Sequence, residues 1–194
     1  MFTYSREAYL AISLAMLVIT FLKSKKAFLI LLFAILFFLS AGNKFLPVSV
    51  SERITAIKDN SQDESTQRRI LIWQMAGKEI AKSPILGNGY AASKYVLPFD
   101  THNMYIDITL EAGIFSLIVL LMIFHNIYQV SKKAYLSSDI FCKKLGLGLL
   151  GSLVALMVCN FFGTRLHLFS INCYFAVLVG MVTKCLCENK GLQT

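Results

Sequence analysis

The chain has 194 residues, 56% of them hydrophobic, and a mean hydropathy of +0.63. Average soluble domains carry more charge and fewer apolar residues, so the composition excludes that class. The net charge of +8 does not indicate a nucleic-acid partner, because the basic residues gather at the borders of apolar blocks. Since these blocks are continuous rather than periodic, we predict an all-α integral membrane protein that forms a single membrane domain over residues 1–194.

Five apolar blocks are long enough, or nearly long enough, to cross a bilayer. The first two are residues 8–22 and 27–46, and the third is residues 105–124. The fourth is residues 145–162, and the fifth is residues 168–186. The first block is short for a full span. We therefore predict about five transmembrane helices.

Clusters of lysine predict how these helices are oriented. One cluster follows the first block, another separates the third and fourth blocks, and the last follows the fifth block. The clusters consist of Lys23, Lys25, Lys26, Lys132, Lys133, Lys143, Lys144, Lys184 and Lys190. With five spans all of them fall on one side, which the positive-inside rule assigns to the cytoplasm. Residues 44–104 then form an external, periplasmic loop between the second and third spans.

The five cysteines lie outside this external loop, where oxidation would make a disulfide expected. Cys185 and Cys187 form a pair at the end of the last block. Two thiols at this spacing are too few to close a zinc site, so we interpret them as apolar residues at a helix end.

The external loop contains a segment with helical periodicity, RRILIWQMAGKEIAKSP over residues 68–84. Its apolar residues recur at steps of three and four, and a proline ends the pattern. These apolar residues are Ile70, Trp73, Gly77, Ile80 and Ala81. We expect an amphipathic helix on the outer membrane face, with Trp73 at the level of the lipid headgroups. The following PILGNGY predicts a tight, glycine-rich turn.

Arg69 and Trp73 are four residues apart and therefore share a helix face. One interpretation is an arginine that reaches to the membrane surface and stacks on an anchoring tryptophan. The other is an anion site, because a guanidinium binds phosphate oxygens bidentately. The residues alone leave both interpretations open.

The third block begins with unusually polar residues. If its helix starts near Thr101, then Asn103, Asp107 and Glu111 form one polar stripe, with His102 at its mouth. A carboxylate at bilayer depth costs roughly 2.5–3.5 kcal/mol, so such groups normally face a cavity or a partner. Alternatively, the His and Asn only cap the helix. For the whole group we favour a functional cavity.

The stretches RILIW, PILGNGY and HNMYIDITLEAG occur in this order and spacing. Together they resemble the C-terminal conserved region of the O-antigen ligase and O-antigen polymerase superfamily. The early SREAYLA resembles the Ser-Arg that opens this region, so the resemblance covers residues 5–124 and includes the last two spans by topology. Members normally carry several further spans before it. We therefore expect a fragment, a split or truncated gene product, or a second polypeptide that supplies those spans.

The resemblance implies a multi-pass glycosyltransferase of the bacterial inner membrane, with its active side periplasmic or extracellular. Such a ligase moves a glycan from a polyprenyl diphosphate carrier to lipid A–core or another glycan acceptor, without metal or cofactor. It serves lipopolysaccharide or surface polysaccharide assembly. One alternative is an O-antigen polymerase that joins carrier-linked repeat units. Another is an inactive or accessory remnant that binds carrier lipid without transfer.

A transporter or ion channel is a further alternative, which would use the polar stripe as its path. Such a path needs charges deep in several spans. The first, second, fourth and fifth blocks carry almost none between their ends, which argues against this class.

The resemblance also implies roles for single residues. Arg6 and Arg69 match the arginines expected to hold the diphosphate, and His102 matches the histidine expected to engage the acceptor hydroxyl. Two guanidiniums in a dry site stabilise a leaving diphosphate, and an imidazole can accept a proton at neutral pH. We expect these three side chains to converge in one outward-opening pocket. Substrate-binding roles are expected for Arg68, Trp73, Asn103, Tyr105, Glu111 and Arg165.

Within that second set, three expectations are more specific. Arg68 is expected to contact a second phosphate or a lipid headgroup. Glu111 is expected to orient His102 or Arg69 from within the membrane. Arg165 lies in the short external turn between the fourth and fifth blocks, where it either binds glycan or phosphate or is simply solvated.

Overall fold

A computed structural model describes residues 6–45 and 63–191 of the chain, and every regular element in these residues is helical. The elements are α1 (Arg6–Lys23), α2 (Lys25–Phe45), α4 (Asp63–Lys82), α5 (Ala92–Val96), α6 (Met104–Tyr135), α7 (Ile140–Phe162), η2 (Arg165–His167) and α8 (Phe169–Gly191). The predicted all-α class is therefore confirmed. Part of the predicted external loop lies outside the described residues.

Three of the described helices are long and apolar enough to cross a membrane. They are α6, α7 and the part of α8 from Phe169 to Glu188. The apolar part of α1 is shorter, from Ala8 to Lys23, and α2 has 21 residues. Large apolar side chains point away from the protein, such as Phe33 of α2, which is 71% exposed, as expected for surfaces that face lipid. The chain is thus a multi-pass membrane protein, and the count of five spans stays a prediction.

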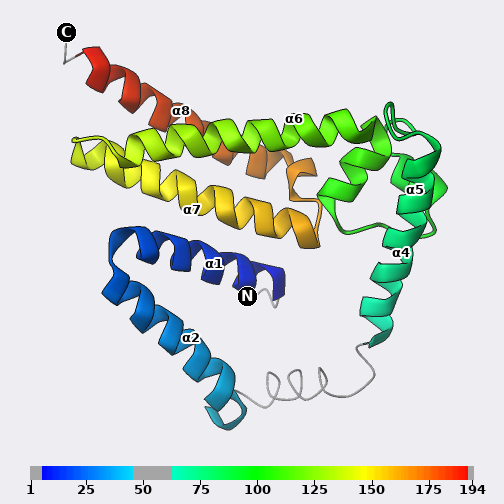
Figure 1. The fold of residues 1–194 in the computed structure, drawn as a ribbon, viewed down its shortest axis with the longest axis horizontal. Helices are drawn as coiled ribbons and strands as arrows, with labels where there is room; N and C mark the ends of the chain where they lie inside the picture. Colours follow the sequence, from blue (N-terminus) through cyan, green and yellow to red (C-terminus); the bar gives the residue numbers. More distant parts are fainter. Residues whose placement is uncertain (1–5, 46–62, 192–194) are drawn as a thin grey trace.

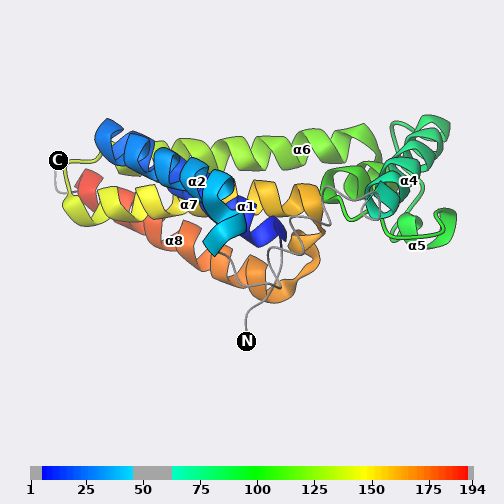
Figure 2. The ribbon, with the colours of Figure 1, turned by 90° about the horizontal axis from the view of Figure 1, so that it is seen from below.

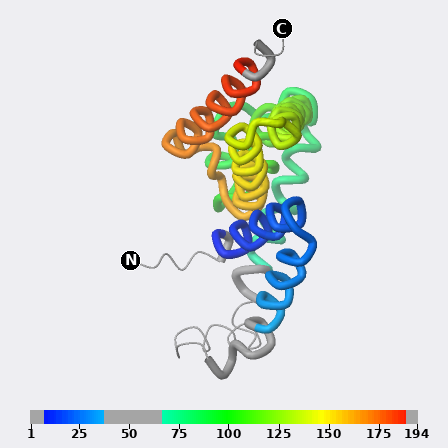
Figure 3. Tube along the Cα trace, turned by 90° about the vertical axis from the view of Figure 1, so that its left-hand side faces the viewer, coloured from blue at the N-terminus to red at the C-terminus, as the bar shows by residue number. Residues whose placement is uncertain are grey.

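Helix α7 lies at the centre of the bundle. It forms an antiparallel pair with α6, and it also packs against α1 and α8, which lie on different sides of it (Figures 1 and 3). Leu120 and Phe124 of α6 pack against Leu153 and Leu156 of α7 in a buried cluster. Helix α2 packs mainly against α1 and leads away from the bundle (Figure 1).

The two ends of the bundle differ in charge. The α1–α2 turn and the α6–α7 turn lie at the same end (Figure 1). These turns carry most of the predicted lysine clusters, so the expectation that the clusters share one side agrees with the fold. Helices α4 and α5 gather at the opposite end (Figure 2), together with η2 and the beginning of α1. We call these the lysine end and the α4 end.

Helix α6 is interrupted near its start. Gly113 has a φ of 76° and a ψ of −176°, so residues 104–112 and residues 114–135 are separate helical segments. The predicted third block, residues 105–124, therefore differs from the structure in its bounds. The straight part begins after Gly113 and continues to Tyr135, while the polar residues belong to the short first segment.

The PILGNGY turn fills this interruption. The backbone N–H of Asn88 donates to the Leu110 carbonyl at 2.8 Å, and that of Gly89 donates to the Glu111 carbonyl at 3.0 Å. Ile114 N–H in turn donates to the Pro84 carbonyl at 2.9 Å. A broken helix leaves backbone groups without partners, which is costly in or near lipid. The turn satisfies these groups from outside α6.

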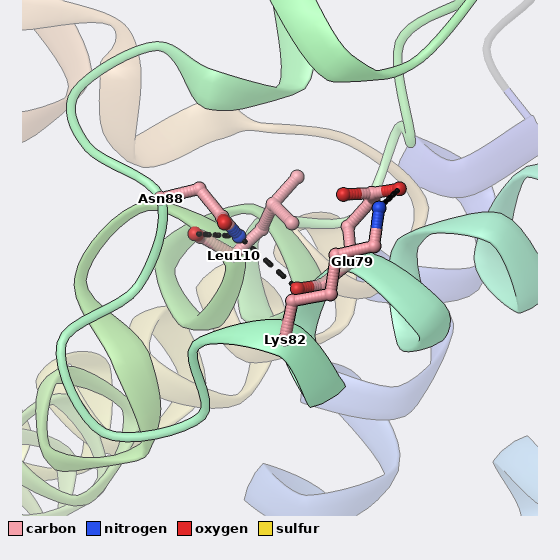
Figure 4. Close-up of polar contacts among 4 residues, drawn as sticks. All are labelled: Glu79, Lys82, Asn88 and Leu110. Atoms are coloured by element: carbon pink, nitrogen blue, oxygen red, sulfur yellow. Dashed lines mark hydrogen bonds and ion pairs between the residues drawn. The ribbon is translucent and has the colours of Figure 1, made fainter.

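The Asn88 side chain joins α4 to the same place. Its amide nitrogen lies 3.3 Å from both the Leu110 and the Glu79 carbonyl oxygens, as Figure 4 shows. Beside it, Lys82 and Glu79 form an ion pair of 2.7 Å at the end of α4 (Figure 4). The C-terminal turn of α4 is therefore fixed to the end of the first α6 segment.

Helix α4 confirms the predicted amphipathic helix over residues 68–82, but its packed face differs from the predicted one. Ile72 and Ala76 are buried against the first segment of α6, with Ile80 beside them. Ile70 is 47% exposed and Gly77 is also exposed. The packed stripe follows steps of four residues. The expected position of this helix on the membrane surface stays a prediction.

Candidate functional site

His102 lies at the α4 end in a strained backbone conformation. Its φ of 50° places it in the left-handed region, and its side chain is exposed. That region costs a non-glycine residue on the order of 1 kcal/mol, so the surroundings must hold it there. Both neighbours are buried, with Thr101 0% and Asn103 3% exposed. The loop therefore presents the imidazole outward between two fixed residues.

A buried hydrogen-bond network fixes these neighbours. The Thr101 hydroxyl donates to a carboxylate oxygen of Asp107, which is buried in the first segment of α6. The backbone N–H of Asn103 donates to the Thr101 hydroxyl oxygen at 3.1 Å. Asn103 is the N-cap of α6, because its side-chain oxygen accepts from the N–H groups of Tyr105 at 3.0 Å and Ile106 at 3.2 Å. The capping interpretation is thus confirmed for Asn103, and its substrate contact stays a prediction.

Trp73 ties α4 to this loop. Its indole N–H donates to the Thr101 carbonyl oxygen at 2.9 Å. Its ring meets the ring of Phe161 edge to face, with 5.9 Å between centroids. Trp73 therefore joins three separate parts of the chain: α4, the loop before α6 and the end of α7.

Arg69 lies one helical turn before Trp73 on the same face of α4. Its side chain is partly buried, and it makes no hydrogen bond or ion pair with another residue that the structure describes. Trp73, on the same face of α4, bonds to Thr101, the residue before His102. The convergence of Arg69 with His102 stays a prediction. Arg68 is exposed beside Arg69.

Glu111 lies near the end of the first α6 segment. Its carbonyl receives the Gly89 N–H, at the interruption of α6, and its side chain is partly exposed. In the described part of the chain its carboxylate makes no hydrogen bond to His102 or Arg69. Glu111 and Gly113 form the Glu-x-Gly of the sequence motif. A glycine is required at position 113, because a Cβ there would lie 1.9 Å from the Ile85 carbonyl oxygen. The proposed orienting role of Glu111 receives no support from these contacts.

Tyr105 serves as a tie within the protein. Its phenol hydroxyl donates to the Met157 carbonyl oxygen of α7 at 2.9 Å. This bond holds the first α6 segment beside the outer half of α7. Its expected contact with substrate stays a prediction.

An apolar groove of about 620 Å³ opens near the α4 end. It lies among four elements, with Ala8 from α1, Leu156 from α7, Arg165 from η2 and Phe175 from α8 in its lining. Arg6 begins α1, two residues before Ala8, but its side chain lies outside the described residues. The convergence of Arg6 with Arg69 and His102 therefore stays a prediction.

The position of Arg165 depends on a buried asparagine. Asn160 is 0% exposed, and its side-chain oxygen accepts from the Leu166 N–H at 3.1 Å. Its amide nitrogen donates to the Leu156 carbonyl at 2.8 Å. This pair of bonds ties η2, and with it Arg165, to the end of α7. Nothing in its sequence surroundings singled out Asn160.

The α4 end of the bundle carries Arg69 on α4, the exposed imidazole of His102, and an apolar groove with Arg165 in its lining. Guanidinium groups suit phosphate oxygens, an imidazole suits a hydroxyl, and an apolar groove suits a hydrocarbon chain. Together the fold and these residues define a class: a multi-pass helical membrane protein with polar side chains gathered at one end.

The comparison with known families identifies this class further. The family model described as O-antigen ligase matches residues 1–121, which cover more than half of the chain. The chain therefore belongs to the O-antigen ligase family, and the resemblance found in the motifs is confirmed. The match includes α4, the PILGNGY turn and the His102 loop.

Similar curated proteins come from Rickettsia and carry the name "putative polysaccharide ligase". That of Rickettsia felis is 31% identical over an alignment of length 108 that covers 45% of this chain and 26% of the relative. That of Rickettsia conorii is 32% identical over an alignment of length 103 that covers 44% of this chain and 24% of the relative. The matched part thus spans about a quarter of the length of these relatives. No solved structure matches the chain.

Proposed function

We propose that this chain contains the donor and acceptor site of a membrane glycosyltransferase of the polysaccharide ligase type. Its donor is a glycan on a polyprenyl diphosphate, and its acceptor is lipid A–core or another glycan. The observation that carries the proposal is the buried Thr101–Asn103–Asp107 network, which presents His102 outward next to the Trp73 tie. Membership of the O-antigen ligase family supports the reaction class.

The proposed reaction needs one proton acceptor and a stabilised leaving group. The acceptor hydroxyl oxygen bonds to the anomeric carbon of the donor sugar, and the bond from that carbon to the diphosphate oxygen breaks. His102 takes the hydroxyl proton, while Arg69 and Arg6 stabilise the charge that grows on the diphosphate. Arginine supplies here the charge stabilisation that a metal ion supplies in other transferases.

The apolar groove beside Arg165 is the proposed place for part of the polyprenyl chain. It combines apolar lining with a cation, as the junction of an isoprenoid chain and a diphosphate requires. The α4 end then faces the periplasm or the cell exterior, and the lysine end faces the cytoplasm. We propose the bacterial inner membrane, about five spans, and a need for further spans supplied in the same or a second polypeptide.

The test is glycan transfer in a cell that lacks its own O-antigen ligase. The chain is expressed alone and together with a polypeptide that supplies further membrane spans, and transferred glycan is measured on lipid A–core. His102→Ala and Arg69→Ala should each lower transfer by about 10²-fold or more, because they remove the base and a charge-stabilising group. The length of the products distinguishes ligation of finished chains from joining of repeat units.

Two control variants match these substitutions. Lys78→Ala removes an exposed cation from the same helix as Arg69, and His125→Ala removes an exposed imidazole from α6. Both should transfer like the unchanged chain and reach the membrane in equal amount. Normal transfer by His102→Ala or Arg69→Ala would contradict the proposal, as would an equal loss in all four variants.

A further inference from the structure

Three side chains with metal-ligating atoms meet at the lysine end. They are Asp139, which precedes α7, Cys142 in the first turn of α7, and Cys185 in α8. One carboxylate oxygen and the two sulfur atoms all lie within 4.8 Å of one another. The proposed transfer reaction, at the opposite end of the bundle, does not involve these residues.

The local structure brings them together for identifiable reasons. Asp139 is the N-cap of α7, and its Oδ2 accepts from the Cys142 N–H at 2.9 Å. The same oxygen lies 3.8 Å from Cys185 Sγ, which donates to it. Cys142 is 0% exposed and packs in a buried cluster with Leu149 and Val182, which keep this side of the group dry. Two helices are therefore held with their thiols facing each other.

The spacing suits a small tetrahedral metal ion. With metal–sulfur bonds near 2.3 Å and metal–oxygen bonds near 2.0 Å, tetrahedral ligands are separated by roughly 3.8 Å for two sulfurs and roughly 3.5 Å for sulfur and oxygen. The observed upper limit of 4.8 Å requires a contraction of about 1.3 Å or less, within the reach of side-chain rotation. No helix has to move.

The charges around the group are mixed. Binding of a divalent ion releases the two thiol protons to solvent, and the ion with two thiolates and one carboxylate then carries a net charge of −1. Lys143, Lys144 and Lys184 neighbour the two cysteines in sequence, but Lys143 lies over the Tyr135 ring, 5.4 Å from its centroid, and Lys184 pairs with Glu188 at 3.7 Å. The N-terminus of α7 favours anionic groups in its first turn.

We propose that Asp139, Cys142 and Cys185 bind a thiophilic divalent ion of the zinc class and thereby tie α7 to α8. Three protein ligands leave the fourth tetrahedral position for water. Cys187 does not belong to the site, because residues two apart on a helix point in different directions and its side chain is exposed. Of the Cys185–Cys187 pair noted in the sequence, only Cys185 belongs to the proposed site. The second thiol is that of Cys142, on another helix.

The test is titration of the purified full chain with Co²⁺ under a non-coordinating reductant. Co²⁺ bound by thiolates gives an intense charge-transfer absorption, so one equivalent should produce this band, and Zn²⁺ should remove it. Cys142→Ser and Cys185→Ser should each abolish the band. Asp139→Asn keeps a good N-cap but offers a weaker ligand, so it should lower the affinity at least about tenfold.

Matched controls use the other thiols. Cys173→Ser and Cys187→Ser change exposed cysteines and should leave the band and the affinity unchanged. If Cys142→Ser fails to fold, Cys185→Ser and Asp139→Asn decide, together with a rise of the melting temperature on Zn²⁺ addition that only the unchanged ligand set shows. Absence of the band from the reduced, folded chain would overturn the site. So would its persistence in Cys185→Ser, or the finding of a Cys142–Cys185 disulfide with no metal uptake after reduction.

Discussion

At the scale of single residues, the Thr101 hydroxyl is the centre of the site. It donates to Asp107, accepts from the Asn103 N–H, and its residue's carbonyl accepts from Trp73. Buried polar networks of this kind are strong when complete and costly when one member is missing. The strained conformation of His102 depends on this completeness, because both residues next to it belong to the network.

Thr101→Val tests this dependence. Valine keeps the shape but leaves the Asp107 carboxylate without this donor and the Asn103 N–H without its acceptor, so the free energy of unfolding should fall by about 1–3 kcal/mol. The measurement is the unfolding midpoint of the purified chain in detergent. Thr183→Val is the control. Thr183 is exposed, and its hydroxyl donates to the Val179 carbonyl of its own helix. The expected change in the free energy of unfolding is within about 0.5 kcal/mol. Equal effects of the two substitutions would contradict the role of the network.

At the scale of elements, the interruption of α6 and the PILGNGY turn form one unit. Gly87 has a φ of 72°, and a Cβ there would lie 2.3 Å from the Glu111 carbonyl oxygen. Gly113 has a φ of 76° and would meet Ile85 in the same way. The two glycines therefore allow the backbones of the turn and of α6 to touch. This contact explains why a Pro-x-x-Gly-x-Gly turn and a Glu-x-Gly occur together in the sequence.

Gly113→Ala should disrupt this unit. The alanine methyl would clash with backbone and require a positive φ, so we expect a loss of more than about 2 kcal/mol of stability. Gly148→Ala and Gly180→Ala are matched controls in α7 and α8, because a Cβ at either has no atom within 4 Å. These should be neutral or stabilising by about 0.5–1 kcal/mol, since alanine favours helix. Thermal unfolding of the three variants is the measurement. A neutral Gly113→Ala would show that the break in α6 is not required.

The sequence allowed some of these elements to be predicted and not others. Continuous apolar blocks predicted α7 and most of α8, and the three- and four-residue periodicity predicted α4, because both signals are local. The break at Gly113 was not predicted, since a lone glycine inside an apolar block is usually tolerated in a helix. The break depends on a turn more than twenty residues earlier in the chain, residues 84–90. The packed face of α4 was not predicted either, because it also depends on residues distant in the sequence, such as Leu110.

The candidate site shows the same limit. Motif spacing pointed to Arg69, Trp73 and His102, and the structure joins Trp73 to the residue before His102 through the Thr101 carbonyl. It did not point to the roles of Thr101 or Asn160, because single polar residues acquire meaning only from partners distant in sequence. The orienting role expected of Glu111 stays a prediction, whereas its backbone carbonyl accepts from the glycine-rich turn.

At the scale of the whole molecule, the two ends of the bundle divide the chemistry. The α4 end carries the imidazole, the arginine face and the groove, and the lysine end carries the cysteine–aspartate group. The helices between them expose apolar side chains along their length, as in Phe115 and Val177. If lysines face the cytoplasm, the transfer site opens outward, which is where a polyprenyl-linked glycan and its acceptor would meet.

The proposed function requires that Arg69 and His102 share one outward-opening site. Cross-linking of Arg69→Cys with His102→Cys measures this, using a short, membrane-impermeant bismaleimide on intact spheroplasts and mass spectrometry of the linked peptides. Cys173→Ser and Cys187→Ser in the same chain remove the exposed native thiols. We predict a 69–102 cross-link without permeabilisation, and much less linkage when Lys78→Cys replaces Arg69→Cys. Linkage only after permeabilisation, or none between 69 and 102, would contradict the account.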